Sequence, residues 1–144
     1  MAFVLILFVI VTGAFLPLQA GVNARLAHFV GGPVRASFVS FVVGALVLLV
    51  LVLVAYRGGG HRAGDAPWWA WVGGALGAFY VVSAVVVGPR IGAAAYFGVL
   101  VAAQLVTGVL ADRFGWLAFQ QRELTPLRLL GIALLVGGAV LVRV

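Results

Sequence analysis

The chain has 144 residues, of which 65% are hydrophobic and 8% are charged, against roughly 45–50% and roughly 25% in soluble domains. Its charged side chains are nine arginines, two aspartates and one glutamate, which give a formal net charge of +6, and it has no cysteine. Twelve charged side chains cannot cover the surface of a soluble fold. The composition therefore predicts one integral membrane domain over residues 1–144. Without cysteine, the chain has no disulfide, thiolate metal site or cysteine nucleophile.

Five apolar runs predict five membrane-spanning helices, because a bilayer core takes about 20 apolar residues per helix. The runs are continuous, whereas the strands of a membrane barrel are short and alternating. The expected helices occupy about 2–20, 34–56, 67–88, 91–111 and 125–143. The predicted fold is therefore an all-α polytopic bundle of five transmembrane helices. The expected breaks between them are residues 21–33, 57–66, 88–90 and 112–124.

A proline and a group of polar side chains mark the end of the first run. Pro17 lacks an N–H and its ring conflicts with the carbonyl of Gly13, so a kink and a hinge are expected at these two residues. If the helix continues past Pro17, Gln19 and Asn23 lie on one face, four residues apart. The two amides would then bind a solute, and Arg25 would attract a negative group. The alternative is that these three residues cap the helix and meet lipid headgroups.

Polar side chains also occur inside the later runs. Gln104 lies in the middle of the fourth run and should face protein, either as pocket lining or in an interhelical hydrogen bond. Tyr80 in the third run is a candidate for the same pocket wall. Ser37, Ser40 and Thr107 are expected to return their hydrogen bonds to carbonyls of their own helices.

No carboxylate lies in the middle of any run, so a buried acid that exchanges protons for a cationic drug is missing. Asp112 at the end of the fourth run is expected to pair with Arg113 or Arg128. Gly73 and Gly77 form a GxxxG pattern, which favours close helix packing in lipid. The two histidines are isolated, no catalytic or phosphate-binding motif is present, and neither a metal nor a cofactor is expected.

The arginines are divided almost evenly between the two predicted membrane faces. The face of the N-terminus holds five, Arg57, Arg62, Arg113, Arg122 and Arg128, and the opposite face holds four, Arg25, Arg35, Arg90 and Arg143. An excess of arginine on one side fixes orientation. The small bias predicts insertion in both orientations and an antiparallel pair, with a single orientation, N-terminus inside, as the alternative. No basic cluster predicts a nucleic-acid partner.

Several segments resemble the YdcZ family, a bacterial inner-membrane group of the drug/metabolite transporter superfamily. They are LPLQAGVNARLA, GGP, SFVVG, PWWAWVGGALGAFYV and PRIGAA, together with Gln104. The resemblance covers essentially the whole chain, and NARL and WWAWVGG are its most specific parts. It implies about five helices per subunit and an antiparallel two-subunit unit. It supplies neither a substrate nor binding residues.

These observations predict a small transporter of the bacterial inner membrane that works by alternating access at a midplane pocket. Gln19 and Asn23 would hydrogen-bond a small solute, Arg25 would recruit a negative group, and Tyr80 and Gln104 would line the wall. The partner would be a second copy of the chain or a paralogous subunit. The alternatives are a passive dual-topology channel and a membrane assembly subunit that transports nothing.

Overall fold

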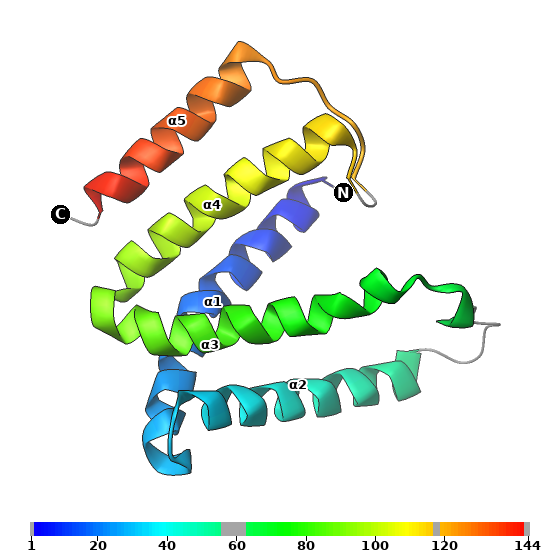
Figure 1. Ribbon diagram of the computed structural model, residues 1–144, viewed down its shortest axis with the longest axis vertical. Helices are drawn as coiled ribbons and strands as arrows, with labels where there is room; N and C mark the ends of the chain where they lie inside the picture. The colour runs from blue at the N-terminus through cyan, green and yellow to red at the C-terminus, as the bar shows by residue number, and fades with distance from the viewer. Residues whose placement is uncertain (1, 56–62, 117–118, 143–144) are drawn as a thin grey trace. The chain divides into compact units, whose positions relative to one another are not determined.

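The computed structural model describes residues 2–55, 63–116 and 119–142, and within these ranges it contains helices and no strand (Figure 1). Four helices are long and apolar enough to cross a membrane, and a fifth apolar helix is shorter. The all-α, multi-spanning fold predicted from the sequence is thus confirmed. The helices are α1 (Ala2–Val30), α2 (Pro33–Ala55), α3 (Gly73–Ile91), α4 (Ala93–Phe114) and α5 (Pro126–Leu141), with short 3-10 helices η1 (Ala63–Asp65) and η2 (Trp68–Val72) before α3.

The chain forms two compact units, Met1–Pro89 and Arg90–Val144. The first contains α1, α2 and most of α3, and α1 packs on α2. The second contains α4 and α5, which pack on each other. α5 has 16 residues, so it rises about 24 Å, less than the roughly 30 Å of a bilayer core.

The predicted break at residues 21–33 is wrong, because α1 continues to Val30 and only Gly31 and Gly32 separate it from α2. Both glycines have positive φ, 83° and 132°, a conformation that glycine adopts at little cost. A Cβ at Gly31 would also lie 2.8 Å from Nη1 of Arg35. The polar residues after Pro17 therefore belong to the helix and not to a loop.

The predicted break at residues 88–90 is wrong as well, since α3 runs through Pro89 to Ile91. Proline disfavours the helical conformation of the residue before it but does not forbid it. The break lies at Gly92, whose φ of 86° is one that side-chain-bearing residues rarely adopt. At its N-terminal end the third helix is expected from the sequence to start at residue 67. Pro67 instead precedes the 3-10 helix η2, and α3 begins at Gly73.

Caps define the turn between α4 and α5. α4 extends to Phe114, beyond the expected end at residue 111, and Gly115 ends it with a left-handed φ of 62°. Thr125 caps α5, because its side chain accepts a hydrogen bond of 3.3 Å from the backbone N–H of Arg128. The expected fifth helix at residues 125–143 therefore matches α5 closely.

Two glycines lie where a neighbouring helix makes contact. A Cβ built at Gly98 on α4 would lie 3.6 Å from the Cα of Ala139 on α5. A Cβ at Gly77 on α3 would lie 3.5 Å from the ring of Phe41 on α2, but one at Gly73 would meet nothing within 4 Å. Of the predicted GxxxG pair, one glycine thus faces a neighbouring helix, and among the described glycines Gly98 alone would place a Cβ within 4 Å of the backbone of another helix.

Candidate functional site: a polar crevice between α1 and α3

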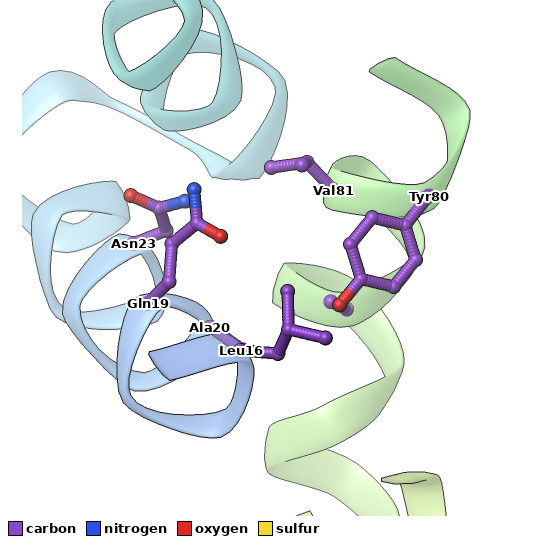
Figure 2. A pocket seen from close by; sticks show the side chains of 7 residues that line it. Leu16, Gln19, Ala20, Asn23, Tyr80 and Val81 are labelled. Atoms are coloured by element: carbon purple, nitrogen blue, oxygen red, sulfur yellow. The ribbon is translucent and has the colours of Figure 1, made fainter. Parts of the chain in front are cut away.

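A crevice in the first unit brings polar side chains of α1 and α3 together (Figure 2). It is a shallow hollow, partly open to the outside, and none of its space is wide enough for a water molecule. It is lined by Leu16, Gln19, Ala20 and Asn23 of α1 and by Tyr80, Val81 and Ala84 of α3. Three of the five residues predicted to bind solute, Gln19, Asn23 and Tyr80, therefore line one crevice.

The helical repeat explains which residues of α1 line the crevice. Positions separated by three, four and seven residues lie on one face of a helix, and Leu16, Gln19, Ala20 and Asn23 follow that spacing. The predicted stacking of Gln19 and Asn23 holds because α1 is continuous through both. The lining also includes Ala20 of α1 and Ala84 of α3, whose side chains are small.

Asn23 is the most deeply buried of the polar lining residues, with 4% of its surface exposed. Its amide Nδ2 donates a hydrogen bond of 3.2 Å to Oγ of Ser40 on α2. The hydroxyl oxygen of Ser40 thus accepts a bond from another helix, a contact that the sequence did not predict. The Gly31–Gly32 turn lies midway between the two residues, so the α1–α2 hairpin places them side by side.

The two other hydroxyl residues behave as the sequence predicts. Oγ of Ser37 donates to the carbonyl of Pro33 at 2.9 Å. Oγ1 of Thr107 donates to the carbonyl of Ala103, also at 2.9 Å. Both bonds lie within one helix and span four residues, so neither hydroxyl requires a partner elsewhere.

Gln19 and Tyr80 occupy opposite sides of the crevice. The side chain of Gln19 is exposed and lies between Asn23 and α3, whereas the half-buried ring of Tyr80 projects from α3 (Figure 2). Oγ of Ser83 donates to the backbone carbonyl of Tyr80 at 2.9 Å. The amide of Gln19 and the phenol of Tyr80 thus line a crevice whose other residues are Asn23 and four apolar side chains.

Arg25 does not line the crevice, so the predicted grouping with Gln19 and Asn23 does not form. In a continuous helix, two residues correspond to about 200° of rotation, which places Arg25 on the face opposite Asn23. Its guanidinium lies 5.7 Å from the ring centroid of Phe29, a contact between cation and aromatic face. Arg25 is close to Gln19 and Asn23 in sequence, but residues 21–25 are helical, so the helix turns Arg25 to another face.

Gln104 and the hinge residues lie outside this lining as well. Gln104 is an exposed residue of α4 and belongs to the second unit. Gly13 and Pro17 lie inside α1, which continues through both. The hinge at these two residues stays a prediction.

The ion pair expected for Asp112 is present in the second unit. Nη2 of Arg128 lies 2.5 Å from Oδ2 of Asp112, and Nη1 donates to the carbonyl of Glu123 at 3.3 Å. Of the two predicted partners, Arg128 is the one that pairs. The carboxylate at the end of α4 is thus matched by a cation from α5.

Comparison with known proteins identifies the family. The family model described as "Putative inner membrane exporter, YdcZ" matches residues 4–141. The chain belongs to the YdcZ family. It is 32% identical over 143 residues to the inner membrane protein YdcZ of Escherichia coli strain K12, with 94% of this chain and 91% of the relative covered. No solved structure gives a significant match.

Membership of the YdcZ family confirms the resemblance seen in the sequence. Together with the apolar helices it establishes a multi-pass protein of the inner membrane. It also supports a membrane transporter or exporter as the class of function, since the family is described as an exporter and not as an enzyme. Sequence reasoning missed Ser40, Val81 and Ala84, whose roles depend on helix packing.

Proposed function

We propose that the chain moves a small solute across the inner membrane by alternating access, and that the crevice between α1 and α3 is its binding site. The observation that supports this most is the polar stripe of α1, formed by Gln19 and Asn23. The stripe lies inside a helix of 29 residues, which is longer than the about 20 residues that span a bilayer core. Polar groups at membrane depth are costly and tend to mark solute pathways. Here an amide of α1 and a phenol of α3 face the same narrow space.

Movement of α1 would open and close this site. The crevice is too narrow for water, so a solute enters only if α1 and α3 separate. Gly13 and Pro17 precede the polar stripe, and a proline weakens the helix by removing one backbone hydrogen bond. Interrupted or weakened helices are common at transporter sites. The segment before Pro17 would therefore move relative to the segment that carries Gln19 and Asn23.

A second copy in the opposite orientation completes the proposed unit. Among the described residues, the walls of the crevice come from α1 and α3 alone, and the near balance of arginines allows both orientations. Gln104, exposed on α4, would then supply a further polar side chain from the partner copy. A paralogous subunit of similar shape would serve in the same way.

Cysteine labelling tests the water path without knowledge of the substrate. The natural chain has no cysteine, so Gln19→Cys creates the sole thiol. A charged, membrane-impermeant methanethiosulfonate reagent modifies the thiolate, which needs water to form. We expect Gln19→Cys to react at least about tenfold faster than Leu18→Cys, its matched control, because Leu18 does not line the crevice and has 65% of its surface exposed on an apolar helix.

Equal, slow reaction of the two thiols would show that no water reaches Gln19 and would remove the proposed pathway. The same reagent also reports orientation when applied to Gly64→Cys in the exposed η1 helix between α2 and α3. Labelling from both sides of sealed vesicles is the result expected of dual insertion. Labelling from one side alone excludes an antiparallel pair of identical chains.

A further inference from the structure

The crevice contains no group that could balance the charge of a bound ion. None of its seven lining residues is an acid or a base. Arg25 projects from the opposite face of α1, and Asp112 is already paired with Arg128. An ion moved from water to an apolar site without a partner loses a large solvation energy. The lining that one copy provides therefore favours an uncharged solute.

The two amides of α1 differ in what they can still bind. Nδ2 of Asn23 is committed to Ser40, which fixes this buried side chain against α2. For Gln19, no hydrogen bond to another described residue is present, and its exposed carboxamide lies toward α3 in Figure 2. A carboxamide offers an acceptor oxygen and two N–H donors. Gln19 can thus pair with a solute that carries both a donor and an acceptor.

On the assumption that the proposed transport function is correct, we propose that the solute is a small uncharged molecule with an adjacent donor and acceptor, such as an amide, bound by the Gln19 carboxamide. Its apolar part would contact Leu16 and Val81 of the lining. Asn23 acts as a positioning residue, since its bond to Ser40 holds α1 on α2. This assignment separates Gln19 from the pair of equivalent amides that the sequence predicted.

Three probes of matched size test this class: propionamide, propionate and propylammonium. Binding to the purified chain in lipid nanodiscs is measured at pH 7 by saturation-transfer NMR. We expect propionamide to bind at least about tenfold more tightly than either ion, a difference of about 1.4 kcal/mol. Gln19→Leu should abolish propionamide binding, and Gln19→Glu should transfer the preference to propylammonium. Gln120→Leu, which changes an exposed residue far along the chain in the α4–α5 connection, is the control and should bind as the natural chain does.

The proposal is wrong if propionamide binds no more tightly than the two ions, or if Gln19→Leu retains its binding. The labelling of Gln19→Cys separates this failure from failure of the proposed function. A reactive thiol without propionamide preference leaves the transport pathway in place and rejects the solute class. If the Gln19→Cys thiol does not react but the natural chain still prefers propionamide, the crevice is a binding site without a water path. That result rejects transport through the crevice.

Discussion

Gly98→Leu is expected to lower the free energy of unfolding of the α4–α5 pair by about 1–3 kcal/mol, the usual cost of overpacking. A Cβ at Gly98 already lies 3.6 Å from Cα and 3.7 Å from Cβ of Ala139. These distances are ordinary contacts, so a methyl group fits, but leucine adds carbons beside the backbone of Ala139, at the edge of the cavity that Gly98 and Ala139 line. Displacement of Ala139 by these carbons weakens the close packing that holds the two helices together in lipid.

Unfolding of the purified chain in detergent by sodium dodecyl sulfate, followed by circular dichroism, measures this effect. Gly98→Ala should unfold within about 0.5 kcal/mol of the natural chain, because it adds only the methyl group that fits. Gly108→Leu is the matched control on the same helix, since a Cβ there meets nothing within 4 Å. Equal stability of the two leucine variants would show that α4 and α5 do not pack at Gly98.

Arg128→Leu is expected to destabilise the same helix pair by about 1–3 kcal/mol, the cost of leaving a partly buried polar group without its partner. The variant removes the contact with Asp112, whose side chain is 24% exposed. It also removes the hydrogen bond to the carbonyl of Glu123. The carboxylate then remains at the C-terminal end of α4, where the helix dipole disfavours a negative charge.

The same unfolding titration checks this result. Arg122→Leu is the control, because the bond that joins Arg122 to the carbonyl of Asp112 uses its backbone N–H and survives the change. Asp112→Asn combined with Arg128→Leu should recover part of the lost stability, since the unpaired charge is gone. If Arg128→Leu is no less stable than Arg122→Leu, the ion pair contributes nothing to the α4–α5 connection.

The number of helices follows from the sequence because the bilayer sets a single length scale for apolar runs. Helix ends follow less well, since polar residues inside a membrane helix resemble a loop until their spacing is considered. Asn23 illustrates this, because it falls in the expected break at residues 21–33, whereas α1 continues through it to Val30. Likewise Pro89 looks like a break, but the positive φ that turns the chain belongs to Gly92.

Only part of the candidate site can be predicted from the sequence, because only part of it depends on helical spacing. The stacking of Gln19 on Asn23 requires only a continuous helix, and that condition also places Arg25 on the opposite face. The contact between Asn23 and Ser40 depends on how the α1–α2 hairpin closes. The lining by Val81 and Ala84 depends on how α3 packs. Such tertiary contacts have no periodic signal in a single sequence.

Solute flux tests most directly the claim that Gln19 lies on the transport path. Proteoliposomes are loaded with a defined mixture of uncharged amides and polyols, carboxylates and amines, and mass spectrometry follows the loss of each, with protein-free liposomes giving the passive leak. We predict that the natural chain and Gln120→Leu release at least one uncharged solute equally fast, and that Gln19→Leu releases it at least about tenfold more slowly. Flux at the passive rate for every solute, or flux through Gln19→Leu at the rate of the natural chain, would contradict the claim that Gln19 lies on a transport path.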